Sequence, residues 1–170
     1  MMQPLLMLAA AALAACGEPS AAQAPAGPYD LPELTGRVVD NAGLLPADRE
    51  TLLSRALEET ERATGHQFVV VTLPTLDGKP IEKVGLALGR GWRLGRRGYD
   101  DGVLLIVAPN ERKVRIEVGR GLERTLTDAE AAAIIQQRIL PRFRRGDMTG
   151  GILTGSAGII REIGVPGVKR

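Results

Sequence analysis

The chain has 170 residues, a formal net charge of +2 and 44% hydrophobic residues, enough for the core of one ordinary domain. Aromatic residues make up only 3% and are not interleaved with basic ones, which argues against nucleic acid as a partner despite a pI of about 9.0. Cys16 is the single cysteine, so an intramolecular disulfide is excluded and the core alone must hold the fold.

The first residues have the pattern of a secretory signal. Leu5 to Ala15 is an apolar run, too short for a membrane span of about 20 residues, and no Lys or Arg precedes it. It runs into Leu13-Ala14-Ala15-Cys16, which is similar to a bacterial lipobox, where the cysteine becomes the lipidated first residue. We therefore predict a lipoprotein signal peptide over residues 1–15 and lipidation of Cys16. An ordinary cleaved signal with a chance cysteine, or an unprocessed apolar N-terminus, are the alternatives.

The rest of the chain divides by composition. Residues 16–36 are rich in Pro, Ala and Gly without an apolar period, which is typical of a flexible tether. Residues 37–164 have the length of one domain, and residues 165–170 form a tail without a second apolar span. The expected location is the bacterial cell envelope, on a periplasmic or other extracytoplasmic face, with the N-terminal lipid in the membrane.

In the first half of the domain, strands and helices are predicted to alternate. Residues 37–40 form a short strand that ends in a turn signal, and Pro46 suits the first turn of a helix that Gly65 ends. Residues 67–73 are a β-branched run, typical of a strand covered on both faces. Residues 81–94 have the apolar spacing of a helix.

The second half predicts a hairpin followed by helices. The apolar strand 103–108 and the alternating strand 112–118 are separated by a three-residue turn, which gives a hairpin over about 103–118. Thr127 and Glu130 have the spacing of a capping box, and the last helix covers about 147–163. Strands interleaved with helices, plus one hairpin, predict an α/β fold: a three-layer α/β/α sandwich with a mixed central sheet.

Carboxylates stand at strand ends and loop junctions. The antiparallel hairpin would place Asp100 and Asp101, before its first strand, beside Glu123 and the glycines after its second. Asp128 begins the next helix and Asp40 leaves a strand, so both are expected at the same rim. Oxygen ligands without His or Cys suit calcium or magnesium. The predicted metal ligands are Asp40, Asp100, Asp101, Glu123 and Asp128, and exchanging Asp100 and Asp101 for Asn is expected to abolish cation binding with the fold intact.

Each carboxylate also has a purely structural interpretation. Asp128 could complement a helix dipole, and Asp40 or the Asp100-Asp101 pair could be turn residues. No Ser-His or Cys-His pair is evident, and His66 is expected to be a solvated turn residue after Gly65. The catalytic residues, if there are any, stay unassigned.

Two groups of arginines are candidates for anion contacts. Arg96 and Arg97, just ahead of the acidic pair, could hold phosphate through two-point contacts, or could form a solvated basic loop. The stretch 138–145 contains four arginines around one phenylalanine, and it could touch anionic lipid or be an ordinary solvated surface.

The ordered series VVDNAGLL, TGHQFVVVTL, GWRLG, DDGVLLIV, ERKVRIEVGRGLE, LTD and LPRFRRGD resembles the TPM domain family, named for thylakoid-lumen, photosystem II repair and receptor-modulator members. The resemblance implies an α/β/α sandwich with an acidic cleft that holds the five carboxylates named above, and calcium rather than magnesium. It also implies acid phosphatase activity as a possibility. Two departures are the lack of a following membrane helix and Met148, where an aromatic residue is frequent.

Two functions from different classes therefore stay open. One is an envelope module whose bound cation braces loops that dock on a membrane-protein partner and take part in membrane-protein quality control. The other is a metal-dependent phosphomonoesterase that uses the same cleft, with the metal activating water because no nucleophile is evident.

Overall fold

The computed structural model describes residues 31–164; the predicted signal peptide, Cys16 and the tail 165–170 lie outside them. Four strands form one sheet in the order β1-β2-β3-β4. The first three are parallel and β4 is antiparallel to β3, which confirms the predicted hairpin. The strands are β1 (Val38–Asp40), β2 (Gln67–Thr72), β3 (Gly102–Ala108) and β4 (Lys113–Val118).

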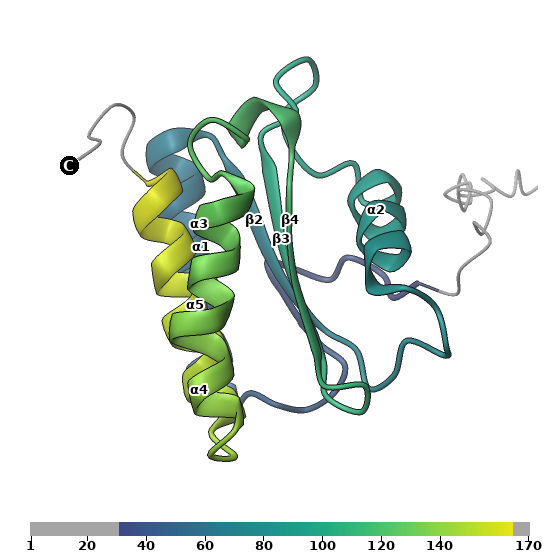
Figure 1. Ribbon diagram of the computed structural model, residues 1–170. Helices are drawn as coiled ribbons and strands as arrows, with labels where there is room; N and C mark the ends of the chain where they lie inside the picture. The colour runs from purple at the N-terminus through teal and green to yellow at the C-terminus, as the bar shows by residue number, and fades with distance from the viewer. Residues whose placement is uncertain (1–30, 165–170) are drawn as a thin grey trace, which may run out of the picture.

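Helices cover both faces of this sheet. One face carries α1, α3, α4 and α5, and the other carries α2 (Figure 1). The helices are α1 (Ala47–Thr64), α2 (Ile81–Gly91), α3 (Asp128–Ile134), α4 (Leu140–Phe143) and α5 (Met148–Ile163). A short 3₁₀ turn, η1 (Arg120–Leu122), follows β4, and a π-helical segment, η2 (Ile135–Ile139), joins α3 to α4. The predicted three-layer α/β/α sandwich with a mixed sheet is confirmed.

Local signals place most helix ends as expected. Pro46 stands at the N-cap of α1, and Gly65 ends that helix in the left-handed conformation with φ of 78°. Thr127 and Glu130 form the predicted capping box at α3. The π-helical segment η2 was not predicted. It ends two residues before Pro141, which cannot donate a helix hydrogen bond and crowds the preceding turn, so the helix is irregular there.

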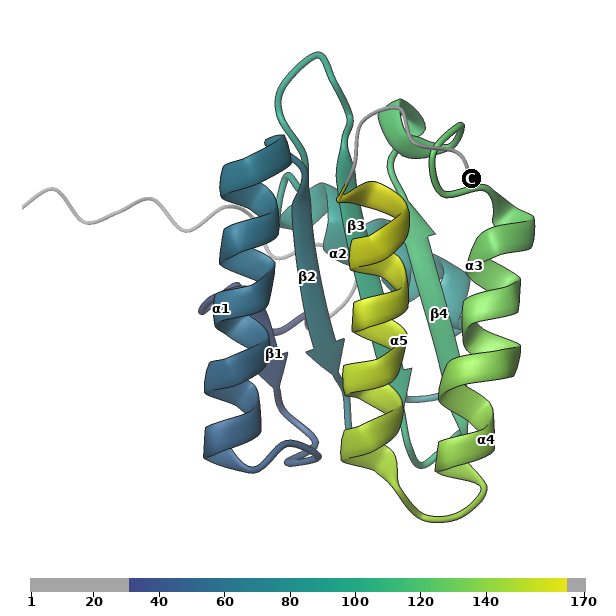
Figure 2. The same ribbon diagram turned by 90° about the vertical axis from the view of Figure 1, so that its left-hand side faces the viewer.

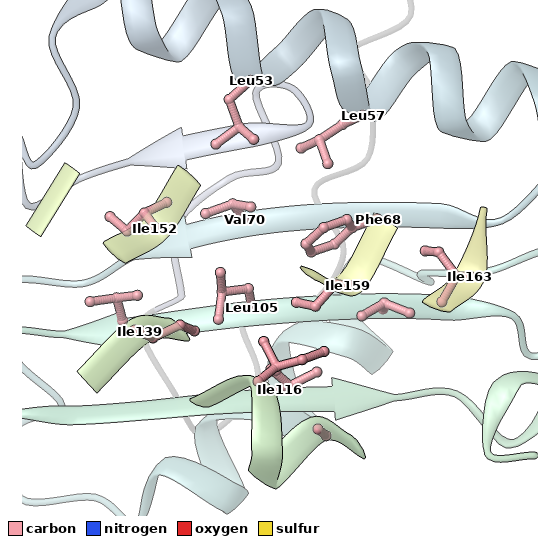
Figure 3. Packing of buried hydrophobic residues seen from close by; sticks show 14 of the residues in the cluster. Leu53, Leu57, Phe68, Val70, Leu105, Ile116, Ile139, Ile152, Ile159 and Ile163 are labelled. Atoms are coloured by element: carbon pink, nitrogen blue, oxygen red, sulfur yellow. The ribbon is translucent and has the colours of Figure 1, made fainter. Parts of the chain in front are cut away.

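Two apolar cores lie on the two faces of the sheet. The larger joins the sheet to α1, η2 and α5, and Leu57, Leu105 and Ile159 in it are completely buried (Figure 3). Burying each such side chain contributes about 2 kcal/mol. Gly155 allows α5 to approach η2, because a Cβ there would lie 2.5 Å from the Ile139 side chain. The smaller core joins α2 to the other face of β2 and β3.

The connections between the parallel strands have opposite handedness. The crossovers β1–α1–β2 and β2–α2–β3 step in the same direction across the sheet, yet α1 and α2 lie on opposite faces (Figures 1 and 2). One of the two crossovers must therefore be left-handed, although almost all such crossovers are right-handed. At the carboxyl ends of β1 and β2 the chain leaves toward opposite faces.

The last residues of the predicted tether are packed on the domain. Leu31 contacts the smaller core, and the Trp92 indole N–H donates to the Pro32 carbonyl at 2.9 Å. A fully flexible segment through residue 36 is therefore not what the structure shows. The reason is that Trp92 has apolar surface and one N–H donor to satisfy, and the tether supplies both contacts.

Candidate functional site

The start of β3 is anchored by one buried carboxylate, Asp101, which is 2% exposed. One of its oxygens accepts the Arg96 backbone N–H at 2.7 Å. The other contacts the Arg96 guanidinium at 2.8 and 2.6 Å and the His66 Nδ1 at 3.1 Å. Both oxygens are thus engaged by the protein, and the three side chains tie the end of α1 to the loop before β3.

Electrostatics keep this network ionised. Burial of the Asp101 carboxyl opposes its ionisation, but the hydrogen bonds from Arg96 and His66 outweigh burial and hold its pKa below the ordinary value. The hydrogen bond to Asp101 raises the pKa of Arg96. The Arg96 guanidinium also lies 4.5 Å from the centre of the Tyr99 ring. The Arg96–Asp101 ion pair, with His66, is therefore a structural clamp, and the Asp101 carboxylate has little capacity left for a ligand.

The neighbouring backbone is packed too closely for side chains. The Gly119 N–H donates to the Gly102 carbonyl at 2.8 Å and the Gly121 N–H donates to the Asp100 carbonyl at 3.0 Å. A Cβ on Gly119 would lie 2.0 Å from the Asp100 carbonyl oxygen, and one on Gly121 would lie 1.9 Å from that of Tyr99. The lack of side chains at Gly119 and Gly121 therefore lets the loop before β3 pack directly against the end of β4.

An open acidic cleft lies beside this clamp, between α2 and the end of the hairpin. It has a volume of about 410 Å³ and is lined by the carboxylates of Asp100, Glu117 and Glu123 together with Arg90 and Arg120. The antiparallel register Val103↔Val118 brings the start of β3 beside the end of β4, as predicted for Asp100 and Glu123. We call this feature the acidic cleft.

The carboxylates of the acidic cleft differ in their freedom. Glu117 accepts a hydrogen bond from Arg115 at 2.5 Å. Asp100 and Glu123 are exposed and form no side-chain hydrogen bond or ion pair with residues 31–164. Asp100 has a positive φ of 50°, which aspartate tolerates better than most residues. Across residues 31–164, no three His, Cys, Asp or Glu side chains are already gathered as a metal site.

A family profile for the TPM domain matches residues 38–162, which is most of the chain. The chain belongs to the TPM domain family. No curated protein matches it. The chain is similar to the solution NMR structure of the N-terminal domain of a protein from P. gingivalis, with 34% identity and a TM-score of 0.71, covering 76% of this chain and 82% of that one.

Two more distant solution structures share the fold of this TPM domain. The N-terminal domain of the cg2496 protein from Corynebacterium glutamicum is 21% identical, with a TM-score of 0.56 and coverage of 86% of this chain and 90% of that one. The BA42 protein from the psychrophilic bacterium Bizionia argentinensis is 16% identical, with a TM-score of 0.56 and coverage of 73% and 90%. At these identities the similarity shows the fold alone.

The expectation that Asp40 lies at the same rim as Asp100 and Asp101 is wrong. Asp40 ends β1 and pairs in register with Thr72, at the end of β2, whereas Asp100 and Asp101 precede β3. Because β1, β2 and β3 are parallel, these positions lie at opposite ends of the sheet. The Asp40 carboxylate accepts from Leu44 N at 3.0 Å, Leu45 N at 2.7 Å and the Thr72 hydroxyl, and so shapes the loop after β1.

Asp128 also lies away from the acidic cleft of this TPM domain. It is the exposed first residue of α3, which packs on the opposite face of the sheet from α2 (Figure 1). Asp128 therefore does not line the acidic cleft, and its place in the first helical turn favours the dipole interpretation.

The phosphate candidates Arg96 and Arg97 do not line the acidic cleft either. Arg96 is held by Asp101, and the cleft arginines are Arg90 and Arg120. The interpretation of His66 as a solvated turn residue was wrong, since its side chain is only 19% exposed and contacts Asp101. The contact between His66 and Asp101 follows from the parallel pairing of β2 with β3. Gln67 pairs with Gly102, so the residues just before the two strands are neighbours.

Proposed function

We propose that this TPM domain binds a hydrated divalent cation in the acidic cleft and serves as a metal-braced module for interaction with membrane proteins and their quality control. The observation that carries the proposal is the pair Asp100 and Glu123, two exposed carboxylates without partners in residues 31–164 that line one cleft with Glu117. Asp101, Asp40 and Asp128 are left out of the site for the reasons given above.

The donor set fits a hard cation in part. Asp100 and Glu123 supply carboxylate oxygens, which calcium and magnesium prefer, whereas the Glu117 carboxylate is shared with Arg115. Because the ligands come from separate segments and are not gathered in advance in residues 31–164, water would fill several coordination positions of the cation. Calcium accepts such irregular shells, whereas magnesium demands near-octahedral geometry, so calcium is favoured.

The cellular part of the proposal comes from the N-terminal sequence. A lipid on Cys16 and the tether 16–36 would hold the domain at the envelope, close to membrane-protein partners. None of the helices formed by residues 31–164 is both long and apolar enough to cross a membrane. The proposed means of attachment is the lipid on Cys16, on a periplasmic or other extracytoplasmic face.

One observation favours a second function, a metal-dependent acid phosphatase acting on phosphomonoesters. Arg90 and Arg120 line the acidic cleft, where guanidinium groups could hold and orient a phosphoryl group. Among residues 31–164, no Ser, Thr, Cys or His lines the cleft, so the attacking group would be water, and Asp100 or Glu123 would take its proton. A cation bound there would supply charge stabilisation and a more acidic water.

Calorimetric titration of the full-length protein with calcium and with magnesium tests the site, and a phosphomonoester assay on the same sample tests the second function. The site variant is Asp100→Asn with Glu123→Gln. Asp128→Asn with Glu59→Gln changes two exposed carboxylates elsewhere and is the matched control.

Binding lost in the site variant and kept in the control supports the cation site. Turnover that needs the metal and is lost with it would make the domain a phosphatase. Equal binding by both variants, or no binding by the wild type, would contradict the proposal.

A further inference from the structure

A second cavity lies at the opposite end of the sheet from the acidic cleft. It has a volume of about 610 Å³ and lies between the β3–β4 turn, α4 and the start of α5. Its apolar walls include Leu140, Phe143 and Met148, and its cations are Arg112, Lys113 and Arg144. We call it the basic groove. A cavity of this volume is typical of a site for a small molecule or a single chain.

The three cations of the basic groove are available to a ligand. Their side chains form no hydrogen bond and no contact ion pair with residues 31–164. Two carboxylates lie nearby. Glu111 accepts through Oε1 from the Thr75 hydroxyl at 2.7 Å and from Leu76 N at 2.9 Å, its Oε2 has no hydrogen-bond partner in residues 31–164, and the charge of Lys113 helps to lower its pKa. Asp147 pairs with Arg142 at 2.8 Å and caps α5. The groove therefore combines apolar walls with an excess of positive charge, since three cations and no carboxylate line it.

From this combination we infer that the basic groove binds one anionic lipid of a bilayer, with an acyl chain along Leu140, Phe143 and Met148 and the headgroup phosphate at Arg112, Lys113 and Arg144. Apolar walls favour a hydrocarbon chain, and the excess of positive charge favours a headgroup with a net negative charge over a zwitterionic one, whose phosphate is balanced by its own cation. The inference concerns a different end of the molecule from the proposed cation site and does not depend on it.

The backbone at the basic groove favours a lipid over an extended peptide. The groove borders β3, whose backbone already pairs with β2 on one side and β4 on the other. The Val107 carbonyl, for example, accepts from Leu73 N at 2.9 Å. Along β3 a bound peptide would find no free main-chain partners, whereas an acyl chain needs none. Of the groove residues, only Lys113 belongs to β4, the edge strand of the sheet.

NMR titration with short-chain lipids below their micelle concentration tests the inference. The full chain carrying Cys16→Ser is used, so that no lipid can be attached to it. Dihexanoyl phosphatidylglycerol is expected to shift the Leu140, Phe143 and Met148 resonances saturably, and dihexanoyl phosphatidylcholine is expected to leave them unchanged.

Two variants in that background locate the lipid. Met148→Glu removes apolar wall and adds a repelling charge; an acidic residue suits the first turn of α5, but Met148 also packs on the larger core, so some loss of stability is expected. Neutralising Arg112, Lys113 and Arg144 to Gln should weaken binding about a hundredfold. The matched control neutralises Arg55, Lys83 and Arg93, which are also exposed, and Arg93 shares the positive φ of Arg112.

Selective shifts by phosphatidylglycerol that both groove variants lose and the control keeps would support the lipid site. Equal shifts with both lipids, shifts confined to other residues, or unchanged binding in Met148→Glu would overturn it. So would inorganic phosphate binding as tightly as the lipid, or a glutamate-rich peptide that saturates the same resonances at lower concentration.

Discussion

At each end of the sheet a carboxylate anchors a loop, but the groups that bind the carboxylate differ. Asp101, before β3, is buried and held by Arg96 and His66, whereas Asp40, after β1, is half-buried and held by backbone amides and Thr72. Both carboxylates anchor a loop. The groups left open beside them differ in sign, with an acidic cleft near Asp101 and the basic groove at the end where Asp40 lies.

An acidic residue at a strand end does not by itself mark a ligand site. Asp100 and Asp101 are adjacent in sequence, yet one is exposed without a partner in the described part of the chain and the other has both oxygens engaged. The useful distinction is whether the carboxylate has donors of its own in the fold.

The largest expected effect tests the tight packing that positions the acidic cleft. Gly119→Ala should lower the free energy of unfolding by about 3 kcal/mol, because its Cβ would overlap the Asp100 carbonyl and force β4 and the loop apart. Gly89→Ala, on α2 with nothing within 4 Å of its Cβ, should raise it by up to about 1 kcal/mol. Urea unfolding measures both; equal effects would show that the contact is not tight.

Asp101→Asn should cause the next largest loss in the free energy of unfolding. Losing the charge weakens the bonds from Arg96 and His66, and we expect a loss of about 2–3 kcal/mol in urea unfolding. Asp100→Asn, one residue away and exposed, should change the free energy of unfolding by less than about 0.5 kcal/mol. Equal stability of the two variants would remove the distinction between clamp and cleft.

The pH dependence of stability should follow the same clamp. The pKa of Asp101 is lower in the folded protein than in the unfolded chain, so its stabilisation is present above the unfolded value of about 4 and is lost as the pH falls below it. The stability difference between wild type and Asp101→Asn should therefore shrink in acid. Asp147, whose pKa the Arg142 hydrogen bond lowers, contributes separately and remains in both proteins. A difference that stays constant down to about pH 2 would contradict this.

Asp40→Ala should have a smaller effect, about 1–2 kcal/mol, because it deprives the amides of Leu44 and Leu45 of their acceptor in a part-buried loop. It should leave any cation affinity unchanged, since Asp40 lies at the far end of the sheet. Calorimetry checks the second point. Loss of affinity in Asp40→Ala would return that residue to the site.

The sequence predicted the fold better than the site. Apolar runs, the hairpin turn and the capping box at Thr127 are local signals, and they predicted the elements and the sandwich. The pairing of β1 with β2 is not local, and without it Asp40 was placed at the wrong end of the sheet. The burial of Asp101 by His66 likewise depends on parallel register, which no single segment of the sequence displays.

We propose that Asp100 contributes to ligand binding, whereas Asp101 stabilises the fold. Thermal unfolding of the full-length wild type, Asp100→Asn and Asp101→Asn, each with and without excess calcium, tests it most directly. We predict that calcium raises the Tm of the wild type, that Asp100→Asn keeps the calcium-free Tm and loses most of the rise, and that Asp101→Asn lowers the calcium-free Tm and keeps the rise. The reverse pattern, with the calcium response lost in Asp101→Asn and kept in Asp100→Asn, would contradict the account.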